Sequence, residues 1–297
     1  MAHTHDSHEV SNSRLVITIL LNVLITVAQI IGGIISGSLA LISDAIHNLS
    51  DSLSIILAWL AQFLGKKPQT AKSTFGYKRA EILAAFINSL ALIGISVYLV
   101  FEAVDRLINP KIVDASWMFW LGLLGLIANG ISVLILEREK DKSINIKAAY
   151  LHLLGDALTS VAVVAGAILI WTFQIYWADS IVTILISIYL FIHTLRLLKE
   201  SVTILMQMAP SEIDLPEIEE RLMKMDELLN IHHIHVWNLT DKLIHFECHL
   251  TLEDDIRISE TQPILDKVRK ILHDEFDIEH VTIQFEFGKK KNKDCGC

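Results

Sequence analysis

Long apolar blocks separated by short polar loops fill the first two thirds of the chain. An α-helix needs about 20 mostly apolar residues to cross a bilayer, and six stretches meet that length. They run over Leu15–Ser36, Leu39–Leu64, Ile82–Ile108, Ala115–Leu136, Ala148–Phe173 and Ile175–Leu198. The pattern predicts an α-helical membrane protein with six transmembrane helices in residues 14–208, preceded by a tail at residues 1–13.

After Met208 the pattern changes to short strands and charged helices. Helical spacing in "DLPEIEERLMKMDELLN" is followed by alternation in "HIHVWNL" and "LIHFECHLTL". A second helix around "TQPILDKVRKILHDEF" leads to the strand "HVTIQFEF". The order αββαβ predicts a ferredoxin-like α+β domain over residues 209–288, with both helices on one face of a small sheet. Residues 289–297 remain as a flexible tail that contains cysteines.

Alternation along the second predicted strand separates a buried face from a polar one. Cys248 shares its parity with Phe246 and Leu250, so we interpret it as a small core residue. Glu247 and His249 have the opposite parity. The polar face therefore gathers imidazole and carboxylate groups, as a metal site requires.

Composition and charge narrow the class of protein. Hydrophobic residues make up 52% of the 297, which is too apolar for an ordinary soluble domain. The net charge of -9 and the lack of a basic stripe with interleaved aromatics argue against nucleic acid as a partner. Lysine and arginine collect in the loops after the second and fourth spans. Basic loops face the cytoplasm, which predicts that both termini and the carboxy-terminal domain are cytoplasmic.

The second span carries a polar stripe in the segment "SDAIHNLSDS". Asp44, His47 and Asp51 fall on one helical face. A carboxylate at the bilayer centre costs about 2.5–3.5 kcal/mol, so such residues usually face a bundle interior and mark a function. A hydrogen-bonded cluster between helices, with the neighbouring serines, is the alternative interpretation.

The fifth span repeats the pattern in "YLHLLGDALTS", with His152 and Asp156 at the same spacing as His47 and Asp51. If the two helices pack together, two nitrogens and two oxygens converge, a complete tetrahedral set for zinc. Imidazole and carboxylate also suit cobalt, iron(II), manganese and cadmium, while the lack of cysteine in the spans disfavours copper(I). Asp44 lies outside the repeated motif; it either supports the ligands, carries protons or only hydrates the pore.

These features resemble the cation diffusion facilitator family. The resemblance rests on the two HxxxD motifs, on "GSLALISDAIHNLSD", on "FGYKRAEILAAFIN" and on "HIHVWNLT", and it covers nearly the whole chain. It implies a homodimeric exporter of divalent metal, driven by protons moving the other way. It also implies that His47, Asp51, His152 and Asp156 are the transport site, with histidine at the first position as in zinc-preferring members.

The resemblance further implies metal ligands in the cytoplasmic domain at His232, His249 and Glu286. Parity groups His232 with Ile234 and Val236, so that assignment is the weaker one. Cys295 and Cys297 are similar to a terminal cysteine pair of some zinc transporters, although one intervening residue departs from the usual two. That tail either reaches the partner subunit's metal site or is disordered. The histidines at the amino terminus are interpreted as part of a solvated tail, with weak metal capture as the alternative: His3, His5 and His8.

Two rival functions use the same residues. An intramembrane metallohydrolase would keep an open coordination position and a general base, whereas the predicted set is closed and neither H-E-x-x-H nor G-x-S-x-G occurs. A membrane-anchored metal sensor would not need ligand pairs on two spanning helices. The sequence therefore predicts a homodimeric zinc/proton antiporter in a bacterial inner membrane, with zinc as substrate and regulator, no organic cofactor and no enzymatic activity.

Overall fold

The computed structural model describes residues 12–65, 67–137, 140 and 144–288. It divides into two compact units. One contains the chain up to Leu57 together with Ile87–Arg196, and the other contains Ala58–Phe86 together with the chain from Leu197 onward. The limits of both units fall inside long helices, so each unit includes parts of helices that continue into the other.

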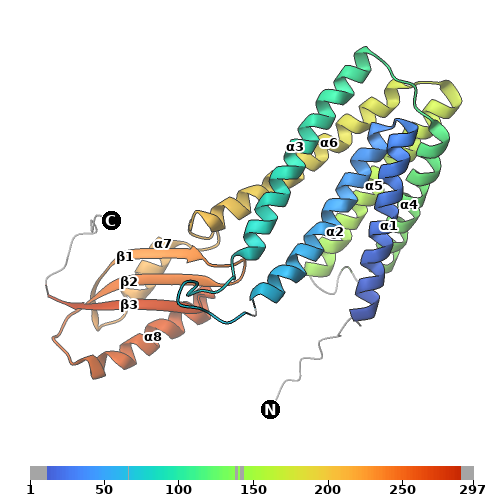
Figure 1. Cartoon of the computed structure of the whole chain (residues 1–297). Coiled ribbons are helices and arrows are strands. Elements are labelled where there is room, and N and C mark those ends of the chain that lie inside the picture. The colour runs from blue at the N-terminus through green and yellow to red at the C-terminus, as the bar shows by residue number, and fades with distance from the viewer. Residues whose placement is uncertain (1–11, 66, 138–139, 141–143, 289–297) are drawn as a thin grey trace. The chain divides into compact units, whose positions relative to one another are not determined.

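Six long helices account for the first two thirds of the chain (Figure 1). Their bounds are α1 (Asn12–Ser36), α2 (Leu39–Gly65), α3 (Ala80–Ile108), α4 (Ala115–Glu137), α5 (Ile144–Phe173) and α6 (Trp177–Leu205). Within the first unit, α4 packs against both α5 and α1. Helices α3 and α6 lie side by side and together line a shallow apolar groove between Ser96 and Ser187.

Within the described residues, four helices are long and apolar enough to cross a membrane: Ala80–Ile108, Ala115–Glu137, Tyr150–Phe173 and Trp177–Leu205. The described apolar part of α1, Asn22–Ser36, is shorter. Helix α2 is not among these four; Asp44, His47 and Asp51 interrupt its apolar sequence together with several serines. The polar stripe that suggested a function therefore also weakens the hydropathy signal of its own helix.

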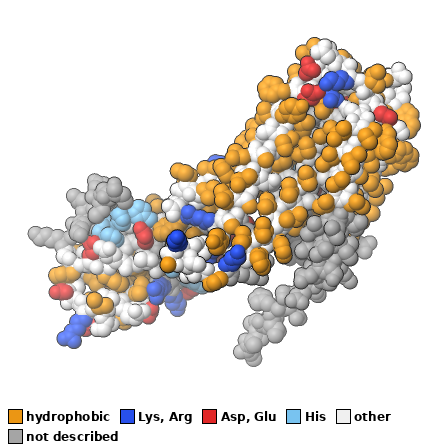
Figure 2. Space-filling model, in the orientation of Figure 1, with side chains coloured by type: hydrophobic (Ala, Val, Ile, Leu, Met, Phe, Trp, Pro, Cys, Tyr) orange, Lys and Arg blue, Asp and Glu red, His pale blue; other side chains and the backbone are white. Residues whose placement is uncertain are grey.

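The outer surface of the helical unit is apolar. Figure 2 shows hydrophobic side chains covering the long helices, with few charges among them. Leu134, Ile135, Phe101 and Ile192 are all exposed by more than 60%. Such a surface cannot be stable against water, and it suits the hydrocarbon of a bilayer, where apolar side chains need no partner.

A buried carboxylate fixes the start of α2. Ser38 Oγ donates to Asp179 Oδ1 at 2.6 Å, and the backbone N–H of Leu39 donates to Asp179 Oδ2 at 2.9 Å. The N–H of Ala40 completes the set at 3.2 Å. The first N–H groups of a helix have no partner within the helix, and a carboxylate there also meets the positive end of the helix dipole. Asp179 of α6 therefore anchors the helix that carries His47 and Asp51.

The carboxy-terminal part of the second unit is a small α+β domain. It contains α7 (Leu215–Leu222), β1 (Leu228–Asn238), β2 (Ile244–Leu252), α8 (Ile258–Phe276) and β3 (His280–Phe287), which is the predicted αββαβ order. The sheet order is β1-β2-β3. Strands β1 and β2 are antiparallel because a short turn joins them, whereas β2 and β3 are parallel because α8 makes the crossover.

One hydrophobic core holds this domain together. Ile218 and Leu222 of α7 and Val268 and Leu272 of α8 are fully buried, in one cluster with the apolar face of the sheet. Cys248 belongs to the same cluster. Because both helices share this core and contact each other, they cover the same face and leave the other face to polar side chains.

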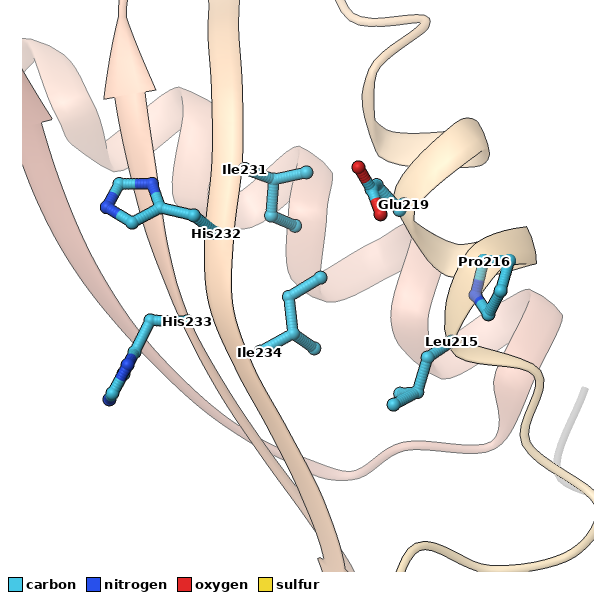
Figure 3. A pocket seen from close by; sticks show the side chains of 7 residues that line it. All are labelled: Leu215, Pro216, Glu219, Ile231, His232, His233 and Ile234. Atoms are coloured by element: carbon cyan, nitrogen blue, oxygen red, sulfur yellow. The ribbon is translucent and has the colours of Figure 1, made fainter. Parts of the chain in front are cut away.

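A β-bulge in β1 changes the parity on which the interpretation of His232 depended. The pairing with β2 shifts between His232 and His235, and His233 has a positive φ of 53°. Figure 3 shows His232 and the adjacent His233 on one side of the strand, with Ile231 and Ile234 on the side that faces α7. The predicted grouping of His232 with Ile234 was therefore wrong, because a bulge inserts an extra residue and alternation restarts after it.

Candidate metal centres

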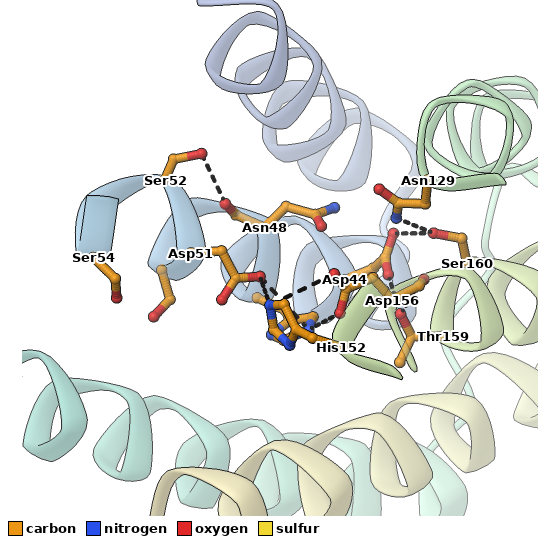
Figure 4. Close-up of polar contacts among 12 residues, drawn as sticks. Asp44, Asn48, Asp51, Ser52, Ser54, Asn129, His152, Asp156, Thr159 and Ser160 are labelled. Carbon is orange, nitrogen blue, oxygen red and sulfur yellow. Dashed lines mark hydrogen bonds and ion pairs between the residues drawn. The ribbon is translucent and has the colours of Figure 1, made fainter. Parts of the chain in front are cut away.

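The two HxxxD pairs meet inside the helical unit. His47 Nε2 lies 2.7 Å from Asp156 Oδ1, and His152 Nε2 lies 3.6 Å from Asp51 Oδ2. Each histidine thus contacts the aspartate of the other helix, as well as its own helix partner at 3.8 Å. Figure 4 shows Asp51 of α2 directed toward His152 and Asp156 of α5. The structure therefore brings the four predicted residues together.

His47, Asp51 and Asp156 each offer one ligand atom within 4.8 Å of one another, and His152 lies beside this group without being part of it. Bonds of about 2.0–2.1 Å to nitrogen or oxygen imply ligand–ligand edges of about 3.3 Å in a regular tetrahedron. The four nitrogen–oxygen separations run from 2.7 to 3.8 Å, on both sides of that length. His47 and Asp156 are buried, and Asp51 and His152 are partly exposed. Two of the four side chains are therefore shielded, and two are partly accessible.

Asp44 lies one turn before His47 and is fully buried. Its carboxylate accepts hydrogen bonds from Thr159 Oγ1 at 2.8 Å, from Gln29 Nε2 at 3.2 Å and from Ser160 Oγ at 3.3 Å. These donors come from α5 and α1, so Asp44 connects three helices beside the candidate site. These hydrogen bonds join α2 to α5 and α1 beside the candidate site.

Helix α6 adds two aromatic neighbours that the sequence analysis missed. The ring of His193 stacks on that of His152 at 6.1 Å between centroids, and Tyr189 meets the ring of His47 edge-on at 6.3 Å. Tyr189 fits there because Gly155 has no side chain: a Cβ on Gly155 would come within 2.4 Å of the tyrosine oxygen. An ionisable residue inside a predicted span was the available signal for His193.

A second group of ligand atoms lies on the polar face of the cytoplasmic sheet. Glu286 Oε1 is 3.1 Å from His249 Nδ1, and Glu286 Oε2 is 3.5 Å from His232 Nε2. His232 pairs directly with His249 in the β1–β2 register. The structure thus brings together the three residues that the family resemblance carried over, with His232 reaching the polar face through the bulge.

The bulge also creates a third group, which the sequence analysis did not find. His233, His235 and Glu247 place one ligand atom each within 4.8 Å of one another. The Nε2 atoms of His233 and His235 are 3.3 Å apart. Two nitrogens at that separation, each bound to one ion at about 2.05 Å, subtend about 107°, which is close to the tetrahedral angle. His233 joins this group because its backbone has a positive φ, a feature that the sequence does not reveal.

Among the described residues, Cys248 does not join these groups. Cys248 is buried in the core, and burial raises the pKa of its thiol to about 12, so it is not a thiolate ligand near neutral pH. His3, His5, His8, Cys295 and Cys297 lie outside the described residues.

Comparisons with known proteins match almost the whole chain. The cation efflux transmembrane domain matches residues 15–206, and the cation efflux protein cytoplasmic domain matches residues 210–287. The metal cation efflux system protein CzcD of Cupriavidus metallidurans is 38% identical over 98% of this chain and 92% of its own length.

Two further relatives are similar over comparable lengths. The cadmium, cobalt and zinc/H(+)-K(+) antiporter of Bacillus subtilis is 38% identical over 96% of this chain and 92% of its own length. The zinc transporter ZitB of Escherichia coli is 37% identical over 99% of this chain and 96% of its own length.

Proposed function

This chain belongs to the cation efflux family, and from that premise we propose that it exports divalent zinc across a membrane in exchange for protons. Family membership confirms the resemblance drawn from the two HxxxD motifs. The observation that carries the proposal is the convergence of His47, Asp51, His152 and Asp156 from two helices. No described residues suggest an open catalytic metal with a separate general base, so transport is preferred to hydrolysis.

Zinc is the proposed cargo because of the ligand chemistry. Two imidazoles and two carboxylates form a tetrahedral set that zinc favours, and two ionised aspartates balance its charge. The same ligands accept cobalt and cadmium, in line with the name of the Bacillus subtilis relative. The name of ZitB supports zinc as the principal ion.

Proton exchange follows from the ligands themselves. Imidazole and carboxylate must lose protons to bind a metal, so binding on one side releases protons and acid on the other side displaces the ion. An empty site with two negative charges is costly to move through hydrocarbon, whereas a metal-filled or protonated site is not. The proposed role of Asp44 is to position the ligands of α2 and α5, through its hydrogen bonds to Thr159 and Ser160.

We further assign all six long helices, including the polar α2, as membrane spans. The basic loops after α2 and α4 support cytoplasmic termini and a bacterial inner membrane. The αββαβ domain is proposed to be ferredoxin-like and to pair two chains into a homodimer. It is also proposed to bind regulatory metal at His232, His249 and Glu286. The neighbouring group of His233, His235 and Glu247 would extend that metal site. Cys295 and Cys297 are proposed to contribute to metal capture by that domain.

Two aspartate variants test the transport site. Asp51→Ala and Asp156→Ala should each reduce zinc uptake into proteoliposomes by about 100-fold or more, since removing one partner from a buried charged group costs about 3–5 kcal/mol. Asp105→Ala is the matched control, because Asp105 lies on the exposed side of α3 and bonds only Asn109 among the described contacts. All three proteins should insert and elute alike in detergent. Zinc flux at the parent rate in either site variant would refute the assignment.

A further inference from the structure

A cavity of about 180 Å³ lies within the second unit, between the loop before α3 and the end of β1. It is lined by Phe75, Gly76, Lys78, Arg79, Gln207, Trp237 and Leu239. Aromatic contacts hold the loop against the sheet here: Phe75 meets the ring of His245 edge-on at 5.5 Å, and Trp237 stacks on the same ring at 5.4 Å. The cavity is therefore formed by packed side chains and not by a chance opening in a loop.

The polar side chains around this cavity can all donate hydrogen bonds. Lys78 and Arg79 are cations, the Trp237 indole only donates, and Gln207 has an amide N–H₂. Among the described residues that line the cavity, none carries a negative charge. Two cations, an indole and an amide around one space form a set of donors that suits an anion.

Arg79 gives an independent indication that a partner is needed. Its Nε and Nη2 atoms are buried, and no described group accepts their hydrogen bonds. A buried charged donor without an acceptor costs free energy that a folded protein normally avoids. The positive potential extends to neighbouring groups: burial lowers the pKa of His245, and His280, Lys78 and Arg79 lower it further. An anion between Lys78 and Arg79 would accept hydrogen bonds from the two buried Arg79 atoms and would offset this positive potential.

We propose that this cavity binds a phosphate group, through the guanidinium of Arg79 and the ammonium of Lys78. The planar guanidinium presents Nε and Nη2 as a fork that matches two oxygens of one phosphate. Arg79 directly precedes α3, which is long and apolar enough to cross a membrane, so the cavity is at the end of a span where lipid headgroups lie. The source of the phosphate is accordingly an anionic phospholipid or free phosphate.

The test uses the full chain, purified in neutral detergent and stripped of lipid. The midpoint of thermal unfolding is followed while phosphatidylglycerol, phosphatidylcholine or inorganic phosphate is added, because a ligand of the folded state raises that midpoint with its concentration. Phosphatidylglycerol should raise the midpoint at concentrations where phosphatidylcholine does not. An equal response to inorganic phosphate alone would support the same site with free phosphate as its ligand.

Three variants assign the effect to the cavity. Arg79→Gln should weaken the response to the anionic probe by about tenfold or more, since hydrogen bonds to charged groups are among the strongest in proteins. Lys78→Gln should weaken it less, and Lys72→Gln, an exposed lysine of the same loop outside the cavity, should leave it unchanged. If Arg79→Gln does not fold, Arg79→Lys and Lys78→Gln give the same comparison. An undiminished response in the Arg79 and Lys78 variants, or an equal loss in Lys72→Gln, would overturn the proposal. None of these outcomes depends on metal export.

Discussion

Each histidine of the candidate transport site has its nearest carboxylate on the other helix. His47 is closest to Asp156, and His152 is closer to Asp51 than to its own helix partner. The residues could be predicted because an imidazole and a carboxylate one turn apart occur twice in apolar surroundings. The cross-pairing could not, since it depends on how the two helices rotate and slide against each other.

A substitution at His47 tests its role as a ligand. His47→Asp replaces a borderline nitrogen with a hard oxygen, so transport of cadmium or manganese should rise relative to zinc. The measurement is the ranking of initial rates for the separate ions in proteoliposomes. A ranking identical to that of the parent would show that His47 does not contact the ion.

Residues missed in the sequence share a physical reason. His193 and Tyr189 belong to an ordinary apolar helix, and only the packing of α6 against α2 and α5 brings them beside His47 and His152. His233 and Glu247 become neighbours of His235 only because β1 departs from regular pleating. Strand parity succeeded for Cys248 and Glu247, where the pairing is regular, and failed for His232 at the bulge.

At the scale of elements, a close contact between α4 and α1 positions a side chain that donates a hydrogen bond to Asp44. Gly125 leaves room for Gln29, and a Cβ at that position would come within 2.5 Å of Gln29 Nε2. The same amide nitrogen donates to Asp44, and Gln29 Oε1 accepts from Asn48. The absence of one side chain on α4 thus allows a hydrogen-bond network that joins α1, α2 and α5.

A double-mutant cycle tests that contact. Gly125→Ala should push the amide away from Asp44, lowering stability by about 1–3 kcal/mol, which is typical of overpacking, and slowing zinc flux. In a Gln29→Ala background the added methyl has nothing to displace, so the same change should cost much less. Thermal unfolding midpoints and flux are measured for all four proteins. Additive effects of the two changes would contradict the proposed contact.

Substitutions of His233 in the β1 bulge can separate the backbone strain at that residue from its contribution to metal binding. A non-glycine residue with φ of 53° is strained by about 1–3 kcal/mol, and glycine relieves that strain. His233→Gly should therefore keep or raise the unfolding midpoint of the metal-free protein, while lowering the zinc bound per chain by one ion. His233→Ala should lose the ion and keep the strain.

Bound zinc is counted by competition with a coloured chelator, in a background where Cys295 and Cys297 are serine. A lower midpoint for His233→Gly, or an unchanged zinc content in both variants, would show that the bulge does not serve metal binding.

At the scale of the whole molecule, much of the architecture follows from periodicity. The αββαβ order and the long helices agree with the predictions because apolar spacing alone determines them. Helix α2 is not among the helices that qualify as spans, and the polar residues Asp44, His47 and Asp51 interrupt its apolar sequence. The parallel pairing of β2 and β3 follows from the crossover through α8. No pattern in the local sequence predicts the bulge in β1.

The proposed coupling to protons is tested on the complete chain. We expect an inward-directed proton gradient to accelerate zinc export from sealed vesicles, and an ionophore to slow it, because protons and metal compete for the same ligands. Flux is measured with and without a pH gradient at fixed zinc, and vesicles with Asp156→Ala define the leak. A rate indifferent to the gradient would favour facilitated diffusion or another counter-ion.

The division of the proposed ligands between α2 and α5 has a mechanical consequence. Each helix alone supplies a bidentate chelate of one imidazole and one carboxylate, and only their alignment makes a tetradentate one. A helix advances about 1.5 Å per residue, so an axial slip of that size between α2 and α5 would change the distances within both cross-helix pairs and leave the pair within each helix unchanged. In the proposed transporter, the aligned helices would offer the ion four groups and the displaced helices only two, so a sliding motion would weaken its binding.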